Sequence, residues 1–156
     1  MSSDYKLDDT DKGILRLLQQ NARMTNKEIA DRLNKSITPI HIRVKRLQDE
    51  GYIQNYVAVL NPKLIDKNLT VFAQIQLKDH SGIALKTFME QSAKLKEVRE
   101  CYHMTGAFDF LLKIAVSSME EYSDVMLKKL SELPGLGAIQ SVFVLTEVKN
   151  DKTYDI

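Results

Sequence analysis

The sequence predicts an α+β protein in which a three-helix unit precedes a βαββαβ unit. Two observations support this prediction. In the first third of the chain, apolar residues recur at helical spacing, whereas the remainder alternates short apolar runs with two amphipathic helices. Capping residues and glycine or proline stops separate these segments. We therefore expect a first domain over residues 1–51, a hinge strand or linker over residues 52–62, and a second domain over residues 63–156.

The composition is typical of a soluble globular protein. Hydrophobic residues make up 44% of the 156 residues, and the net charge is +1. No segment reaches the roughly eighteen apolar residues of a membrane-spanning helix, and the polar, acidic start of the chain does not resemble a signal peptide. The single cysteine, Cys101, permits neither an internal disulfide nor a metal cluster, so we expect it to be an inert packing residue. These observations predict a cytoplasmic protein without a membrane segment or a metal site.

A first helix is predicted over residues 7–20. Asp8 is a favourable N-cap, and Asp11 falls in the first turn, where a carboxylate interacts well with the positive end of the helix dipole. The apolar residues that follow form the side of the helix that faces the core: Ile14, Leu15, Leu17 and Leu18. This helix is the first of the three-helix unit.

A second, short helix is predicted from about Asn26. Thr25 and Glu28 form a capping box, in which each side chain satisfies a free amide at the start of the helix. The helix has fewer than about three turns, so it is stable only when docked on a neighbour. Asn34 follows, and asparagine enters the left-handed backbone region at small cost, which predicts a sharp turn there.

The third helix has either Ser36 or Thr38 as its N-cap, and Pro39 suits the first turn in both cases. Gly51 is a helix stop. Helical spacing places one set of residues inward: Ile40, Val44 and Leu47. It places another set outward or at the flanks: Thr38, His41, Ile42, Lys45, Arg46 and Asp49. Two short helices around a tight turn form a helix-turn-helix, whose second helix enters the major groove of DNA.

Charge supports double-stranded DNA as a partner. Residues 23–46 hold seven cations and two acids, a net charge of +5 in a chain of +1. A charge run alone is equally compatible with ordinary solvated helix faces, but here it coincides with the turn and the capping box. We expect Arg43, Lys45 and Arg46 to bind phosphates, and Thr38, His41 and Ile42 to meet base edges. The whole predicted interface is Asn26, Lys27, Ser36, Thr38, Pro39, His41, Ile42, Arg43, Lys45 and Arg46.

The second domain begins after a stiff, strand-like connector over residues 52–62. Residues 69–78 are predicted to form a strand, and Ser81 caps a helix over about residues 82–95. The side chains that this helix turns inward are expected to be Leu85, Phe88, Met89 and Ala93.

The rest of this domain contains a hairpin, a helix and a last strand. Residues 97–105 and 108–116 are predicted strands joined by a turn at Gly106 and Ala107. Ser118 and Glu121 form a capping box for a helix that stops at Pro134-Gly135, and residues 137–148 form the last strand. This order predicts a ferredoxin-like domain, with both helices on one face of an antiparallel sheet. The other face is partly apolar, which predicts a homo-oligomer with sheets packed face to face.

The chain resembles the Lrp/AsnC family of bacterial and archaeal regulators over nearly its whole length. The segments that carry the resemblance are Leu7-Asp8 through Asp11 to Leu15, Asn26 to Leu33, Arg43 through Leu47 to Ile53, Thr105 to Asp109, Leu133-Pro134-Gly135 and Glu147-Val148. The resemblance implies a transcriptional regulator of amino-acid metabolism, with a winged or plain helix-turn-helix, a hinge strand and an amino-acid-sensing domain. It also implies dimers and often a tetramer of dimers, and it predicts association with the nucleoid.

Two positions depart from the family pattern. Asn34 and Lys35 replace the usual glycine and leucine of the turn, and Ala107 replaces the usual first acid of the sensing turn. With Ala107 beside apolar Met104 and Phe108, we favour leucine or methionine as the effector. The predicted effector residues are Met104, Thr105, Gly106, Ala107, Phe108, Asp109, Gln140, Ser141 and Phe143, the last three across a subunit boundary.

Other interpretations of these residues remain open. Gly106 and Asp109 are also compatible with a purely structural turn. A ligand-independent DNA-organising protein is the alternative function. An enzyme is not expected, because His41, His80 and His103 are scattered without catalytic or metal-ligand spacing, and no glycine-rich phosphate loop is present.

Overall fold

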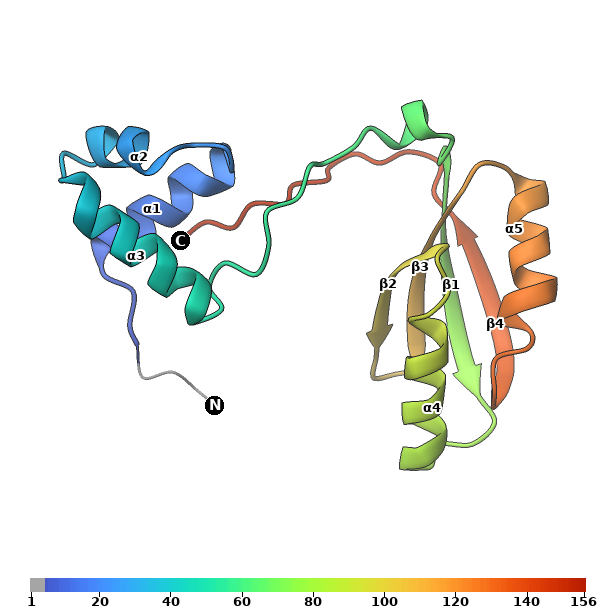
Figure 1. Ribbon diagram of the computed structural model, residues 1–156. Coiled ribbons are helices and arrows are strands. Elements are labelled where there is room, and N and C mark those ends of the chain that lie inside the picture. The colour runs from blue at the N-terminus through green and yellow to red at the C-terminus, as the bar shows by residue number, and fades with distance from the viewer. Residues whose placement is uncertain (1–4) are drawn as a thin grey trace. The chain divides into compact units, whose positions relative to one another are not determined.

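The computed structural model describes residues 5–156, which divide into two compact units (Figure 1). The N-terminal unit extends to Val59 and also includes Lys149–Ile156, and the C-terminal unit is Leu60–Val148. The last eight residues, expected in the second domain, therefore belong to the first unit. Their assignment depends on contacts with residues more than a hundred positions away in the chain, for which the local sequence carries no signal.

The N-terminal unit contains the three predicted helices, α1 (Asp9–Gln20), α2 (Asn26–Arg32) and α3 (Ile37–Asp49). Asp8 caps α1 and Thr25 caps α2, and in both cases the residue three positions later completes the capping box. Asn34 has φ of 53° and Gly51 has φ of 78°, so both turn predictions are confirmed. The core is formed by side chains from all three helices, among them Ile14, Leu18, Ile29, Ala30, Ile40 and Leu47.

The connector after α3 differs from the expected hinge strand. Residues 54–60 are exposed and form no strand within the part of the chain that the structure describes. A single-turn 3₁₀ helix, η1 (Pro62–Ile65), follows, and the Asn61 side chain accepts a hydrogen bond from the amide of Lys63. Alternating apolar residues alone therefore do not make this segment a β-strand, because a strand requires a neighbouring strand to which its amides and carbonyls can bond.

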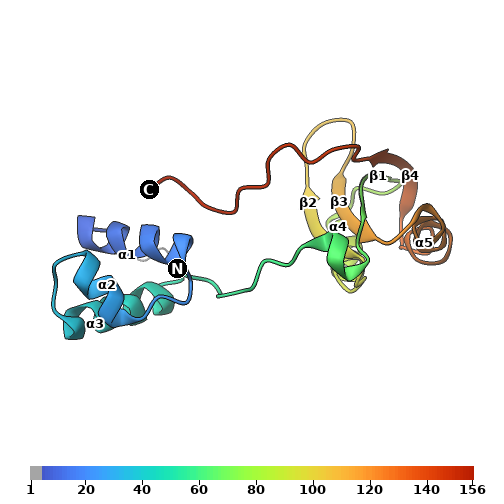
Figure 2. The same ribbon diagram turned by 90° about the horizontal axis from the view of Figure 1, so that it is seen from above.

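The C-terminal unit is a four-stranded antiparallel sheet with two helices. Its strands are β1 (Leu69–Leu77), β2 (Val98–His103), β3 (Phe110–Val116) and β4 (Leu136–Phe143), in the spatial order β2-β3-β1-β4. The helices are α4 (Gly82–Ser92) and α5 (Met119–Val125), which continues as the π-helix η2 (Met126–Leu130). Figure 2 shows both helices on the same side of the sheet. The ferredoxin-like prediction is confirmed.

The two faces of this sheet differ as the alternation predicted. On β1, Val71, Ala73, Ile75 and Leu77 are buried and pack against residues of both helices. The ring of Phe88 from α4 lies 4.7 Å from that of Phe110 on β3. The opposite face carries half-exposed or exposed side chains, which the strand register places together: Phe72, Gln74, Leu111, Lys113, Gln140 and Val142.

Several element boundaries and side-chain directions differ from the sequence-based expectations. Helix α4 ends at Ser92, so Ala93 lies beyond it and is exposed, and Met89 is 38% exposed instead of inward. Strand β4 ends at Phe143, five residues early. Helix α4 buries only the stripe that contains Phe88 and Ser92, because the sheet contacts only one side of it. Ser118 caps α5 by accepting from the Glu121 amide, but the Glu121 carboxylate accepts from Ser117 and so does not complete the predicted capping box.

Cys101 is half-buried on β2, with its sulfur 3.6 Å from the hydroxyl of Ser92. Among residues 5–156, no helix is long and apolar enough to cross a membrane, and no group of His, Cys, Asp and Glu side chains is arranged to hold a metal ion.

Candidate DNA interface and effector site

The exposed side of α3 holds the three residues that the sequence placed against bases. Thr38 and His41 are exposed, and Ile42 keeps 59% of its surface accessible. Lys45, which was assigned to phosphates, is also exposed. These side chains point outward because Ile40 and Leu47 anchor the opposite side of α3 in the core. The structure therefore brings the predicted base-reading residues to one surface of the helix.

Helix α2 contributes to the same region. The Asn26 side-chain amide lies 3.1 Å from Nδ1 of His41, which joins the start of α2 to the outer side of α3. Lys27 is exposed beside Asn26. At the start of α3, Ser36 occupies the N-cap position without a side-chain capping bond, and Pro39 is exposed.

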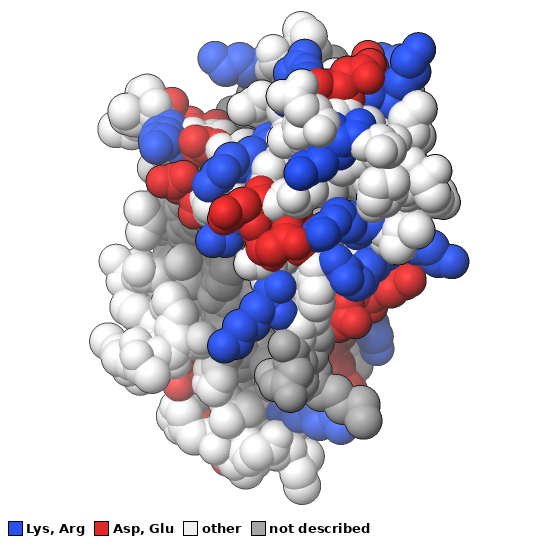
Figure 3. All heavy atoms as spheres, turned by 90° about the vertical axis from the view of Figure 1, so that its left-hand side faces the viewer, with Lys and Arg blue, Asp and Glu red and all other residues white. Residues whose placement is uncertain are grey.

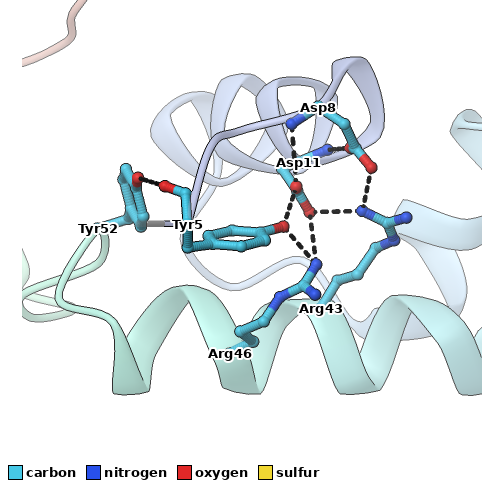
Figure 4. A network of polar contacts seen from close by, with 6 residues as sticks. All are labelled: Tyr5, Asp8, Asp11, Arg43, Arg46 and Tyr52. Carbon is cyan, nitrogen blue, oxygen red and sulfur yellow. Dashed lines mark hydrogen bonds and ion pairs between the residues drawn. The ribbon is translucent and has the colours of Figure 1, made fainter. Parts of the chain in front are cut away.

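Arg43 and Arg46 occupy a different environment from the one expected. Nη1 of Arg43 donates to Oδ2 of Asp8 at 2.6 Å and to Oδ1 of Asp11 at 2.8 Å (Figure 4). Nη2 of Arg46 lies 3.6 Å from Oδ1 of Asp11. Their side chains are only 28% and 39% exposed, because α1 offers two carboxylates against this flank of α3. Both guanidinium groups are thus engaged within the protein.

Two tyrosines extend this network. The Tyr5 hydroxyl donates to Oδ2 of Asp11 and accepts from Nη2 of Arg46, whose guanidinium carbon lies 4.0 Å from the centre of the Tyr5 ring. The hydroxyl of Tyr52, just after α3, donates to the main-chain oxygen of Tyr5 at 2.7 Å. Tyr5, before α1, therefore bonds to Asp11 directly, and Tyr52, after α3, bonds to Tyr5.

The network shifts the acidity of its members. The Asp11 amide, followed by the Arg43 guanidinium, lowers the pKa of Asp8 to about 2. The hydrogen bonds to Asp11 and Asp8 raise the pKa of Arg43. Burial, with the Asp11 carboxylate, raises the pKa of Tyr5. The three shifts in pKa favour a charged Asp8, a charged Arg43 and a neutral Tyr5.

Charges of both signs lie on the surface of the N-terminal unit. Figure 3 shows Lys and Arg side chains interspersed with Asp and Glu on the face that it views. The seven cations of residues 23–46 are therefore not all available to bind DNA. Arg43 and Arg46 form ion pairs with acids at the start of α1.

The turn between β2 and β3 contains the predicted effector residues 104–109. Oδ2 of Asp109 accepts a hydrogen bond from the Leu77 amide at 2.7 Å, and Oδ1 lies 3.0 Å from Nε2 of His80. The main chain of Asp109 bonds to Met104 and Ile75. Asp109 thus joins the turn to the end of β1 and to the segment before α4, as a structural turn residue does.

The tip of this turn is open. Gly106 has φ of +119°, a backbone conformation that glycine adopts easily, and a Cβ added there would meet nothing within 4 Å. Thr105, Gly106 and Ala107 are exposed, whereas Met104 and Phe108 are half-buried. The amides of residues 105–107 donate no hydrogen bond to other main-chain groups of residues 5–156.

The three predicted effector residues of β4 do not share one surface. Ser141 and Phe143 face the helices: the Ser141 hydroxyl lies 2.5 Å from that of Tyr122, and the Phe143 ring packs edge-on against the Tyr122 ring. Gln140 pairs with Gln74 and lies on the open face. Within one chain, the structure therefore does not bring Ser141 and Phe143 to the turn at Gly106.

Local sequence patterns did not reveal the roles of two residues of the N-terminal network and gave only part of the role of a third. Tyr5 and Tyr52 were not assigned a role, and Asp11 was expected to act only on the helix dipole, yet it is fully buried. A pattern within one helix cannot reveal a partner 32 residues away, as Arg43 is from Asp11. A carboxylate in the first turn of an apolar helix, with arginines on a later helix, was the available signal.

Two family models match the chain. The Lrp/AsnC ligand binding domain matches residues 70–154, and a winged helix-turn-helix DNA-binding domain matches residues 7–54. The chain is 38% identical over 152 residues to the proline dehydrogenase transcriptional activator of Rhizobium radiobacter, covering 96% of this chain and 97% of that protein. It is 38% identical over 143 residues to the leucine-responsive regulatory protein of Escherichia coli, covering 92% and 87%.

Solved structures are similar over nearly the whole chain. A transcriptional regulator of Neisseria meningitidis in complex with L-Met superposes with a TM-score of 0.90 at 33% identity, covering 96% of this chain and 97% of that one. AsnC of Escherichia coli superposes with a TM-score of 0.86 at 27% identity, covering 94% and 97%. These likenesses agree with the helix-turn-helix and the sheet described above. The chain belongs to the Lrp/AsnC family of DNA-binding transcriptional regulators, which are not enzymes, and its C-terminal unit is an amino-acid-binding domain.

Proposed function

We propose that the protein controls genes of amino-acid metabolism in response to an amino acid that binds its C-terminal unit. The observation that carries this proposal is the presence, in one chain, of an exposed recognition helix, α3, and of an open turn at Gly106 in a ligand-binding fold. Such a regulator acts in the cytoplasm, on the DNA of the nucleoid.

We assign base reading to the exposed side of α3 and phosphate binding to nearby cations. Thr38, His41 and Ile42 reach base edges, with Ile42 suited to a thymine methyl group. Lys27 and Lys45 are exposed and bind phosphates. Asn26, Ser36 and Pro39 border this surface. Arg43 and Arg46 belong to the same flank, but their bonds to α1 make phosphate binding secondary.

The effector is an uncharged amino acid, with leucine or methionine favoured. Its carboxylate is bound by the exposed amides around Gly106, and its side chain by Met104 and Phe108. Ala107 offers no charge to a basic side chain, and Asp109 forms part of the wall. A related regulator of Neisseria meningitidis forms a complex with L-Met, which supports this choice.

We infer a homodimer, and a tetramer of dimers, in which the open face of the sheet is covered. Phe72, Leu111 and Val142 place apolar surface on that face, beside the ion pair of Lys113 with Glu100 at 3.1 Å. Of the three predicted effector residues on β4, Gln140 lies on this face and is the one best placed to reach a second subunit. A two-fold axis would present two α3 helices to a pseudo-palindromic site.

The experiment that tests the sensor is a thermal-unfolding screen of the full chain against the twenty amino acids. A ligand at about 100 times its dissociation constant stabilises the folded protein by about 2.7 kcal/mol, which is easily measured. We expect leucine or methionine to raise the unfolding temperature and lysine or arginine to leave it unchanged. If no amino acid raises it while the protein still binds DNA, the alternative function applies, a DNA-organising protein without a ligand.

A further inference from the structure

Asp11 is a fully buried carboxylate at the junction of α1 and α3. It is 0% exposed, and its two oxygens receive donors from three parts of the chain. Oδ1 faces Arg43 at 2.8 Å and Arg46 at 3.6 Å, and Oδ2 accepts from the Tyr5 hydroxyl and from the Asp8 amide (Figure 4). A buried charge is tolerated only when it is paired and bonded in this way.

This arrangement fixes α3 relative to α1. Arg43 and Arg46 stand one turn apart on α3, so two ion pairs with one buried carboxylate oppose both sliding and rotation of the helix. The Tyr5 ring, stacked under the Arg46 guanidinium at 4.0 Å, adds a third point of support. His41, Ile42 and Lys45 lie on the same two turns of α3, and their position therefore follows from these bonds.

The same bonds withhold positive charge from DNA. Arg43 has Asp8 and Asp11 as its partners, so its charge is largely neutralised within the protein. The guanidinium of Arg46 has fewer carboxylate partners than that of Arg43. Its Nε atom is buried and has no hydrogen-bond partner among the described residues. Phosphate binding is independent of sequence, and each free cation on this flank would strengthen binding to every DNA equally.

We propose that Asp11 is a positioning residue for DNA recognition, which orients α3 through Arg43 and Arg46 and keeps both cations from binding phosphates regardless of sequence. This inference rests on DNA binding by the helix-turn-helix. Asp11 itself touches no DNA. It raises the ratio of specific to non-specific affinity by orienting the helix and by removing two sequence-independent contacts.

The test compares Asp11→Asn with Asp9→Asn in the full chain. Both substitutions remove one negative charge from the first turn of α1, but Asp9 is exposed and forms no ion pair with residues 5–156. Affinity is measured over a range of salt concentrations for a short mixed-sequence duplex. It is also measured for the duplex that the wild-type protein enriches from a randomised pool.

Relative to Asp9→Asn, Asp11→Asn is expected to steepen the salt dependence on the mixed-sequence duplex by about 0.9, because Arg46 loses its carboxylate partner whereas Arg43 keeps its ion pair with Asp8. It is also expected to lower the specificity ratio by about tenfold, the order of one lost base contact. A structural role alone would lower both affinities together and leave the salt slope unchanged. Equal slopes and equal specificity ratios for the two variants would overturn the proposal.

A second variant tests the positioning role of Asp11 if Asp11→Asn does not fold. Tyr5→Phe removes only the hydroxyl that bridges Asp11 and Arg46 and keeps the ring under the guanidinium. We expect it to lower the specificity ratio in the same direction by a smaller factor, and an unchanged ratio would refute the positioning role. Failure of the wild-type protein to enrich any duplex would instead refute DNA recognition itself, which keeps the two hypotheses separate.

Discussion

The side-chain amide of Gln19 forms two hydrogen bonds with the main chain of Tyr154, which lies 135 residues later in the sequence. Nε2 of Gln19 donates to the carbonyl oxygen of Tyr154 at 3.0 Å, and Oε1 accepts from its amide at 2.6 Å. Ile156 packs against the apolar core of the same unit. The three-helix unit is therefore completed by the last residues of the chain, which follow the strand of the ligand-binding domain.

Deleting residues 149–156 is expected to destabilise the N-terminal unit by roughly 1 kcal/mol. Two exposed hydrogen bonds and part of one apolar side chain are lost, and the entropy regained by the freed segment offsets much of this. Thermal unfolding of the N-terminal unit measures the effect, which corresponds to about 4–8 °C in a unit of this size. Gln19→Ala should reproduce most of it and its exposed neighbour Gln20→Ala should not. An unchanged unfolding temperature after the deletion would contradict the docking.

The bond between Asp8 and Arg43 predicts a pH dependence at the acid end. The pKa of Asp8 lies at about 2, below its ordinary value of 3.8, so the folded state favours the ionised form. Its contribution is fully present above about pH 4 and is lost as the pH falls through about 2. The stability difference between wild type and Asp8→Asn should therefore be constant above pH 4 and shrink toward zero near pH 2. A difference that persists below pH 2 would show that the charge of Asp8 is not its source.

Exposed lysines beside α3 are expected to set the salt dependence of DNA binding. Lys45→Ala should flatten the slope by about 0.9, because one phosphate contact is lost, and should weaken binding to all sequences alike. Lys86→Ala is the matched control, since it removes the same charge from α4, where Lys86 pairs with Glu90 at 3.9 Å. Equal slopes for the two variants would place the phosphate contacts elsewhere.

Asp109→Asn tests the effector site with little disturbance of the turn. An asparagine oxygen still accepts from the Leu77 amide, whereas the negative charge is lost. We expect the unfolding temperature without ligand to change little and the rise caused by the effector to disappear. Calorimetry with the active amino acid measures the affinity, and His80→Ala serves as a control that removes a partner of Asp109 but keeps the carboxylate. Wild-type affinity in Asp109→Asn would leave Asp109 as a turn residue only.

Phe88 and Met89 are neighbours on α4 but differ in burial, which predicts different effects of their substitution on stability. Phe88 is fully buried, so Phe88→Ala should cost about 3–5 kcal/mol through the cavity that it leaves. Its neighbour Met89 is 38% exposed, and Met89→Ala should change stability by about 1 kcal/mol or less. Denaturant unfolding monitored on the C-terminal unit distinguishes the two. Similar losses for both substitutions would restore the inward position that the sequence suggested for Met89.

The elements that the sequence predicted well depend on neighbouring residues. Residues only a few positions apart determine the capping boxes at Asp8 and Thr25, the left-handed turn at Asn34 and the alternation along β1. These features therefore do not depend on contacts with distant parts of the chain. The order of these elements was enough to predict the ferredoxin-like topology and the helix-turn-helix, and the exposed side of α3 followed from helical spacing alone.

Tertiary structure decided which partner each polar side chain meets. The sequence assigned Arg43 to phosphate binding, but only the packing of α1 on α3 brings Asp11 to it from 32 residues away. It likewise turned Ser141 toward Tyr122 and docked Tyr154 on Gln19. A buried charge or amide bonds to whatever donor or acceptor the fold brings within reach, and that choice depends on contacts between distant segments which no local pattern contains.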